Sequence, residues 1–171
     1  MIWLINEQHE NGVWVNLAFI GPVTNIALAI WLDPTIVSKI SKFYLMGGTY
    51  KGWGNMTLTG EFNLWTDPEA SRIVYESFPF IHLLPWEVAD DFIVSEEDWV
   101  KLFEKSDACL STNLFEHINK INDSIDGWIY CCDGLCLAAA VKPSLVTKSY
   151  KTFGRVETQG SEITRGGLFF N

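Results

Sequence analysis

Three short apolar runs alternate along the chain with stretches that begin like helices, and this alternation constrains the fold more than any other feature. The runs are rich in β-branched and aromatic residues, as buried strands are, and span Val13–Ile20, Phe43–Met46 and Phe80–Leu84. Asp33-Pro34 and Asp67-Pro68 each place a capping side chain before a proline that suits the first helical position. Strands that alternate with helices predict an α/β fold with a largely parallel sheet flanked by helices.

The remaining stretches predict further helices and a terminal hairpin. The chain opens in a helical stretch, and a helix through Ile26–Trp31 can take its cap from Thr24 or Asn25. The tail from Lys148 to Phe170 alternates across Gly160, as a β-hairpin does. Other helices are predicted from Asp67-Pro68 to Glu76 and over Ser95–Phe103, Ser106–Ile121 and Ile125–Val141.

Length and composition indicate one domain over residues 1–171. A chain of 171 residues with 48% apolar and 19% charged residues can bury a core and is too hydrophobic for a disordered segment. Both ends look interrupted, because the chain opens in a helical stretch and closes directly after an apolar run. We therefore expect the domain to be incomplete at its N-terminus.

Charge and cysteine usage narrow the partners and the compartment. The chain has 12 basic and 21 acidic residues, hence a net charge of −9, which argues against nucleic acid and anionic membranes as partners. Its apolar runs are too short to span a membrane, and its start lacks the features of a signal peptide. Three of the four cysteines crowd into Cys131–Cys136, which favours reduced thiols and a cytoplasmic location.

Polar residues follow the predicted strands, whose carboxyl ends should meet at one edge of the sheet. Each has a structural interpretation beside a functional one: Thr24 and Asn25 as helix caps, Asn55 as part of a turn, and Glu61 with Asn63 as a solvated loop. If their loop is extended, Glu61 and Asn63 face the same side, since they lie two residues apart. The third loop carries Pro85, Trp86 and Glu87.

Asp133 lies inside a predicted helix that is otherwise apolar. An ionised carboxylate in that setting must be paired, bound to a metal or exposed to solvent, because burying it alone is very costly. His82 lies in a predicted strand and His117 on a polar helix, so both are expected to be structural. Cys132 and Cys136 stand at i and i+4, but the chain has no second pair to complete a zinc site.

The order and spacing of several motifs resemble the inosine–uridine-preferring nucleoside hydrolases. Leu84–Glu87 looks like the variant of animal members, and Thr164–Gly166 matches a short motif of the family's terminal hairpin. The other matching segments are Gly21–Ala29, Asp33-Pro34, Leu45–Gly48, Gly54-Asn55, Glu61–Asn63, Asp67–Ala70 and Asp133–Leu145.

The resemblance implies a Rossmann-like nucleoside hydrolase fold that binds Ca²⁺ and, when full length, forms a homo-oligomer. The activity that it implies is hydrolysis of the N-glycosidic bond of purine or pyrimidine ribonucleosides such as inosine and uridine, giving ribose and a free base in nucleoside catabolism or salvage. Two groups would ligate calcium, the Thr24 carbonyl and the Asp133 carboxylate. The ribose would contact Met46, Asn55, Glu61 and Asn63.

The sequence departs from the family's pattern in two places. The family begins with a strand that ends in a D-x-D-x-x-x-D-D motif, which supplies the general base and further calcium ligands, and no such motif occurs in the 171 residues. Some members carry a histidine as candidate acid where this chain has Cys132. We therefore expect a fragment without the catalytic aspartate. The alternatives are a non-catalytic relative that binds nucleoside or ribose, and an unrelated small α/β domain.

Overall fold

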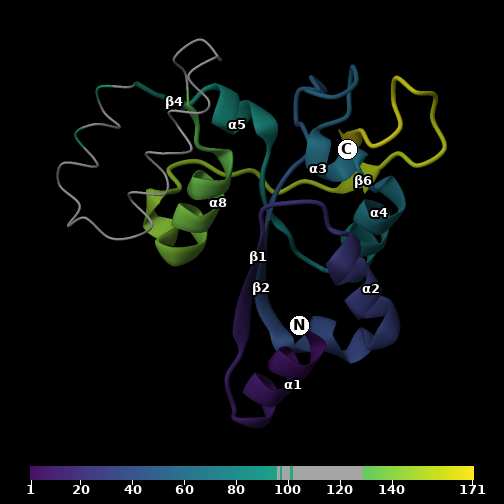
Figure 1. The fold of residues 1–171 in the computed structure, drawn as a ribbon, viewed down its shortest axis with the longest axis vertical. Coiled ribbons are helices and arrows are strands. Elements are labelled where there is room, and N and C mark those ends of the chain that lie inside the picture. Colours follow the sequence, from purple (N-terminus) through teal and green to yellow (C-terminus); the bar gives the residue numbers. More distant parts are fainter. Residues whose placement is uncertain (96, 98–100, 102–128) are drawn as a thin grey trace. The chain divides into compact units, whose positions relative to one another are not determined.

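A three-stranded parallel sheet forms the centre of the fold, as the alternation predicts. The computed structural model describes residues 1–95, 97, 101 and 129–171 (Figure 1). The strands are β1 (Val15–Phe19), β2 (Ile40–Met46) and β3 (His82–Leu84), in the order β1-β2-β3. Phe19 pairs with Leu45, and Met46 pairs with Leu84. Because the strands are parallel, their carboxyl ends lie at one edge of the sheet.

Helices begin at the sites that the Asp-Pro pairs predict. The Asp33 carboxylate accepts the N–H of Thr35 at 3.1 Å, and the Asp67 carboxylate accepts the N–H of Ala70 at 3.0 Å. The described helices are α1 (Ile2–Glu10), α2 (Thr24–Leu32), the 3-10 helix η1 (Pro34–Lys39), α3 (Phe62–Trp65), α4 (Pro68–Ser77), α5 (Trp86–Asp90), α8 (Cys132–Val141) and the 3-10 helix η2 (Pro143–Leu145).

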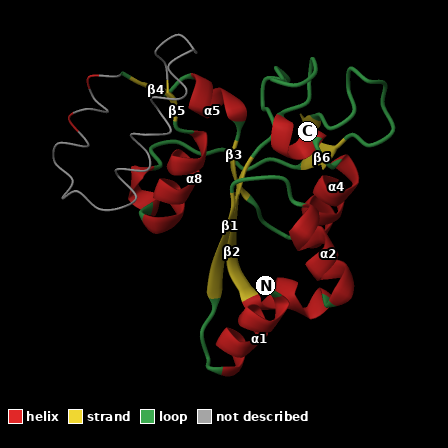
Figure 2. Ribbon diagram, in the orientation of Figure 1, coloured by secondary structure: helices red, strands yellow, loops and turns green. Residues whose placement is uncertain are grey.

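Strand β2 packs both of its faces, because successive side chains of a strand point to opposite sides. Phe43 and Leu45 join the larger core, to which α2 and α4 contribute their apolar side chains. Tyr44 and Met46 join a smaller core with Cys136 of α8. Helix α8 thus covers one face of the sheet, and α2 and α4 cover the other (Figure 2).

The terminal hairpin forms as predicted, from β6 (Gly154–Val156) and β7 (Leu168–Phe170). Val156 and Leu168 are buried in the larger core. The hairpin therefore belongs to the same compact unit as the parallel sheet, which comprises residues 1–88 and 132–171.

Residues 89–131 form a second compact unit. In it, β4 (Ile93–Val94) pairs antiparallel with β5 (Ile129–Tyr130). The predicted helix over Ile125–Val141 is wrong at Ile129 and Tyr130, which pair as a strand with a segment distant in sequence, so α8 begins at Cys132. Its first four positions, residues 125–128, lie outside the described residues. Asp133 consequently lies in the first turn of α8 and not in a helix interior.

Several predictions fall outside the described residues, among them Cys109, His117, the helix over Ser106–Ile121 and most of that over Ser95–Phe103. His82 lies in β3 as predicted and stacks on Tyr44, with 4.7 Å between ring centroids. Within the described ranges, no helix is both long and apolar enough to cross a membrane.

Candidate functional site

The candidate site lies where β2 ends, at the carboxyl edge of the sheet. Met46 is the last residue of the strand, and Gly47 and Gly48 turn the chain away from it. Gly48 has a φ of +66°, and a Cβ built on it would lie 2.9 Å from Leu168 and 3.0 Å from Leu64. Only glycine meets both requirements without strain, so the backbone here can approach its neighbours closely.

Glu61 is the buried carboxylate of this site, with a relative exposure of 2%. Its Oε2 accepts the N–H of Gly48 at 2.7 Å, and its Oε1 accepts the N–H of Asn63 at 3.1 Å. Burial raises the pKa of Glu61, the charge of Asp133 raises it further, and the backbone N–H groups oppose the rise. The carboxylate is held in a fixed orientation at the N-terminus of α3.

Asn63 joins Glu61 to the end of β2. Its Nδ2 donates to the carbonyl oxygen of Met46 at 3.1 Å and lies 3.2 Å from the Met46 sulfur. Both Asn63 and Met46 are buried. Met46, Glu61 and Asn63 therefore come together, but not as an extended or solvated loop: Glu61 caps α3 and Asn63 stands in its first turn.

Asn55 reaches the same helix from an exposed loop. Its Oδ1 accepts the N–H of Phe62, the first residue of α3, at 2.9 Å. The loop closes on itself through backbone hydrogen bonds from Gly54 to Leu58 and from Met56 to Gly60. Asn55 is thus hydrogen-bonded to the segment that carries Glu61 and Asn63. Hydrogen bonds of this segment therefore connect all four residues that are predicted to contact ribose.

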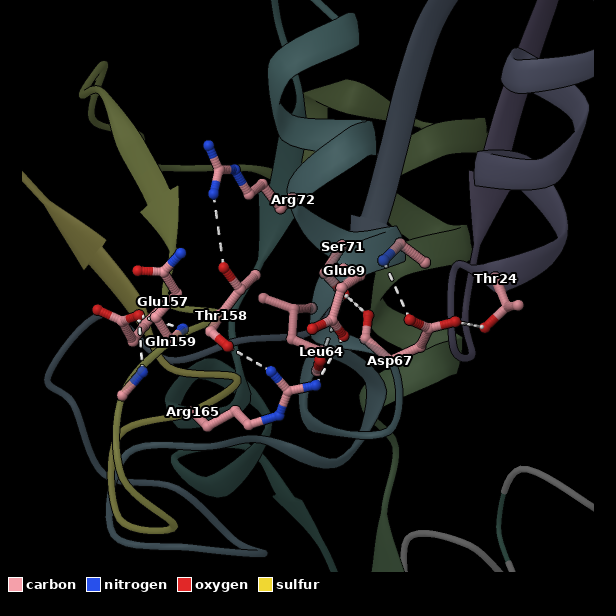
Figure 3. Close-up of polar contacts among 12 residues, drawn as sticks. Thr24, Leu64, Asp67, Glu69, Ser71, Arg72, Glu157, Thr158, Gln159 and Arg165 are labelled. Atoms are coloured by element: carbon pink, nitrogen blue, oxygen red, sulfur yellow. Dashed lines mark hydrogen bonds and ion pairs between the residues drawn. The ribbon is translucent and has the colours of Figure 1, made fainter.

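Thr24 and Asp133 are the two predicted calcium ligands. Helix α2 begins at Thr24 without a side-chain cap, so the prediction that Thr24 or Asn25 caps it is wrong; the Thr24 hydroxyl instead donates to Asp67 at 2.6 Å (Figure 3). Asp133 is partly buried, and burial raises the pKa of its carboxyl group. The negative charge of Asp133 also raises the pKa of Glu61.

By donor type, these two groups suit calcium. Carboxylate and carbonyl oxygens are the ligands that Ca²⁺ prefers, and a cation beside Asp133 would favour its ionised form against the effect of burial. Among the residues that the structure describes, no three His, Cys, Asp or Glu side chains gather closely enough to hold a metal ion. The described part of the chain therefore offers an incomplete set of side-chain ligands.

The terminal hairpin braces the loop that carries Asn55 and Glu61. Gly60 forms an isolated β-bridge with Gly167, and the Thr59 hydroxyl donates to the Ile163 carbonyl at 3.0 Å. Arg165 lies in the segment between β6 and β7, and its guanidinium pairs with Glu69 of α4 at 2.7 Å (Figure 3). The same guanidinium donates to the Thr158 carbonyl. The Thr164–Gly166 motif, to which the sequence assigned no role, lies in this brace.

Glu87 is a buried side chain that sequence reasoning left without a role. Its exposure is 3%, and its two oxygens accept the N–H groups of Tyr50 and Lys51 at 3.0 Å and 2.6 Å. The available signal was its position, since it follows the third strand at the same sheet edge.

Together, Glu61, Asn63 and Asn55 offer hydrogen-bond acceptors and donors of the kind that adjacent hydroxyl groups match.

Comparisons with known proteins place the chain among nucleoside hydrolases. A family model described as inosine-uridine preferring nucleoside hydrolase matches residues 1–171. The chain is 31% identical over 154 residues to Uridine nucleosidase 1 of Arabidopsis thaliana, covering 85% of this chain and 44% of that protein. It is 29% identical over 163 residues to Probable uridine nucleosidase 1 of Oryza sativa subsp. japonica, covering 92% and 50%.

A solved structure titled Inosine-Guanosine Nucleoside Hydrolase shares the fold. It superposes on this chain with a TM-score of 0.85 at 26% sequence identity, covering 99% of this chain and 56% of that one. The chain spans about half the length of the curated relatives it matches.

Proposed function

The chain belongs to the inosine-uridine preferring nucleoside hydrolase family, and from that premise we propose that it binds ribonucleosides for hydrolysis of their N-glycosidic bond. The products are ribose and a free base, as nucleoside catabolism and salvage require. Uridine and inosine are the first substrates to test, because the names of the similar proteins contain them. The observation that carries the proposal is the buried Glu61 carboxylate at the carboxyl edge of the sheet.

Ribose hydroxyls are the groups that suit this set of side chains. The Glu61 carboxylate accepts the backbone N–H groups of Gly48 and Asn63, and because a carboxylate offers about four acceptor sites it can also accept a hydroxyl donor. Asn63 and Asn55 add amide groups, and Met46 provides an apolar wall beside the sugar. Hydrogen bonds to sugar hydroxyls strengthen as the ring gains oxocarbenium character, so these residues act on the transition state as well as on binding.

Calcium is the metal that we propose for the same edge. The Asp133 carboxylate and the Thr24 carbonyl would hold it, with further ligands from water or substrate hydroxyls. A bound Ca²⁺ supplies a water molecule of lowered pKa. Asp133 contributes a partly buried oxygen donor.

Binding without hydrolysis is the second candidate, and one observation favours it. Cys132 precedes Asp133 where some members of the family have histidine. Burial raises the pKa of the Cys132 thiol, so this group is a poor proton donor to a leaving base at neutral pH. No residue of this chain is assigned as general base.

Ligand titration of the wild type and two variants tests the proposal. Calorimetric titration with D-ribose, inosine and uridine should detect saturable binding, and Glu61→Gln should weaken it about 10- to 100-fold, the effect of losing a hydrogen bond to a charged group. Glu76→Gln is the matched control, because Glu76 is an exposed glutamate paired with Arg72. A reducing-sugar assay on the same samples separates the two candidates, since only a hydrolase releases ribose. Absence of binding at millimolar ligand would overturn both.

Thermal unfolding with and without metal tests the calcium proposal. Ca²⁺ should raise the unfolding midpoint of the wild type and leave that of Asp133→Asn unchanged, because binding to the native state alone stabilises it. Glu162→Gln, a change at another exposed acidic position, should respond like the wild type. Equal stabilisation of wild type and Asp133→Asn would remove Asp133 from the site.

Self-association and location complete the proposal. We propose that copies of the chain associate through the apolar face where α1 meets α2, whose exposed residues are Met1, Trp3, Leu28 and Leu32. A cytoplasmic location stays a prediction from cysteine usage.

A further inference from the structure

Glu87 fixes one end of the turn that follows β2. Its carboxylate is 3% exposed, and its two oxygens accept two consecutive backbone N–H groups, those of Tyr50 and Lys51. Hydrogen bonds to an ionised acceptor are roughly twice as strong as neutral ones, and two of them orient the carboxylate completely. The buried carboxylate of Glu87 therefore holds the backbone of this turn in place.

The same turn is held at its start by other partners. Gly47 donates its N–H to the Leu84 carbonyl at 3.1 Å, and the Trp86 N–H donates to the Gly48 carbonyl at 2.9 Å. These bonds extend the pairing of β2 with β3 beyond the ends of both strands. The Gly48 N–H is left to point the other way, and it donates to Glu61 at 2.7 Å.

Glu61 and Glu87 thus both accept hydrogen bonds from the backbone of the turn that follows β2. Gly48, which orients Glu61, lies two residues before Tyr50, which Glu87 holds. Thr49 lies between them and is fully buried, so the turn has little freedom to absorb a shift at either end. We propose that Glu87 is a positioning residue, which aligns Glu61 for the ribose hydroxyls by fixing the backbone of residues 47–51; this inference rests on the proposed function.

The chemistry of this contact makes the role specific for a carboxylate. A glutamine at position 87 has one acceptor oxygen and one NH₂ group, and the NH₂ group would face a backbone donor. One end of the turn would then be released, although the volume of the side chain would hardly change. An aspartate keeps the acceptor-only charge on a side chain shorter by one methylene, so it should restore part of the grip.

Hydrogen exchange of single backbone amides tests, without any ligand, whether Glu87 fixes the backbone of residues 47–51. In ¹H–¹⁵N spectra of the full chain, Glu87→Gln should speed exchange of the Gly48 amide by about 10-fold or more, and Glu87→Asp by less. Glu76→Gln is the control and should leave Gly48 unchanged. Unchanged Gly48 exchange in Glu87→Gln, or equal exchange in the Gln and Asp variants, would overturn the proposal. Should Glu87→Gln fail to fold, Glu87→Asp against wild type decides in the same way.

A double-mutant cycle then tests whether Glu87 acts through Glu61. D-ribose affinity should fall several-fold in Glu87→Gln and should show no further fall when Glu87→Gln is added to Glu61→Gln. A loss that adds in full to that of Glu61→Gln would show an independent, merely structural effect. If wild-type protein binds no ribose, the proposed function fails, whereas Gly48 exchange still decides whether Glu87 controls the turn.

Discussion

At the scale of single residues, opposing effects act on the charged form of the Glu61 carboxylate. Hydrogen bonds from Gly48 and Asn63 favour its charged form, while burial and the charge of Asp133 disfavour it, and the balance raises its pKa. A raised pKa in the folded state means that ionisation costs stability in the absence of a ligand or cation. The residue that we propose for ribose binding is therefore a cost to the unliganded fold.

This cost predicts a pH dependence with a definite sign. The free energy of unfolding is highest, as far as Glu61 is concerned, while its side chain is protonated in both states, which holds below the pKa of glutamate in the unfolded chain, near pH 4. This contribution is lost as the pH rises through the higher pKa that Glu61 has in the folded state. Glu61→Gln should remove that part of the decline, about 1.4 kcal/mol for each unit by which the pKa is raised. Urea unfolding at pH 4, 5, 6 and 7 measures it. Glu76→Gln should keep the wild-type decline, and an unchanged decline in Glu61→Gln would contradict the pKa shift.

Sequence spacing places Glu61 and Asn63 on one side of an extended loop, and this is not their local geometry. Residues two apart share a face only in an extended segment, and the sequence between Gly47 and Trp65 reads as a loop. The structure makes Glu61 an N-cap whose side chain accepts the N–H of Asn63. That arrangement needs Gly48 from a neighbouring segment as a second donor, and such a contact has no signature in local sequence.

At the scale of elements, the brace between the terminal hairpin and α3 depends on a close backbone approach. Gly166 has a φ of +82°, and a Cβ built on it would lie 2.6 Å from the Cα of Trp65. The Gly60–Gly167 bridge lies beside this contact. The hairpin thus reaches the loop of Asn55 and Glu61 only because side chains are absent where the two segments meet.

Two glycine substitutions separate crowding from backbone strain. Gly52→Ala, with a φ of +76° and open space around it, should cost about 1–2 kcal/mol of unfolding free energy, the price of a left-handed conformation. Gly166→Ala should cost about 1–3 kcal/mol more, because Trp65 must also move. Chemical denaturation of both variants gives the comparison, and equal losses would show that the approach to Trp65 is relaxed at no cost.

Element starts were predictable where their signals are local. The carboxylates of Asp33 and Asp67 bond the N–H groups two and three residues ahead, so the sequence alone locates both helix starts. The start of α8 was not, because β5 pairs with β4, which is far away in sequence. In a short apolar stretch, residues such as Ile129 and Tyr130 suit a helix or a strand equally well, and only the pairing with β4 determines which one forms.

At the scale of the whole molecule, the parallel sheet and its family follow from features spread along the entire chain. The family match over residues 1–171 confirms the resemblance that the ordered motifs indicate. The roles of single residues do not follow in the same way, since they depend on which loops meet at the sheet edge. Glu87 illustrates the difference: its motif resembles the family, but its grip on Tyr50 and Lys51 is visible only in three dimensions.

Exposed apolar residues on α1 and α2 predict concentration-dependent association. Trp3 and Leu32 line one face with relative exposures of 72% and 74%, and water contact with such a patch is unfavourable. Sedimentation velocity over a range of concentrations should show larger species, and Leu32→Lys should shift them towards the monomer. Leu58→Lys, at an exposed leucine of the Gly47–Trp65 loop, is the control and should not. Identical sedimentation of both variants would exclude this face.

The two-sided packing of β2 also determines where the chain can change in length. Inserting or deleting one residue within Ile40–Met46 would turn every later side chain of the strand to the opposite face, exchanging the neighbours of Phe43 and Leu45 for those of Tyr44 and Met46. The tip of the Gly47–Trp65 loop carries no such alternation of buried faces, and Leu58 at this tip is 69% exposed. Related sequences should therefore vary in length at the tip of this loop and keep the strand that precedes it constant.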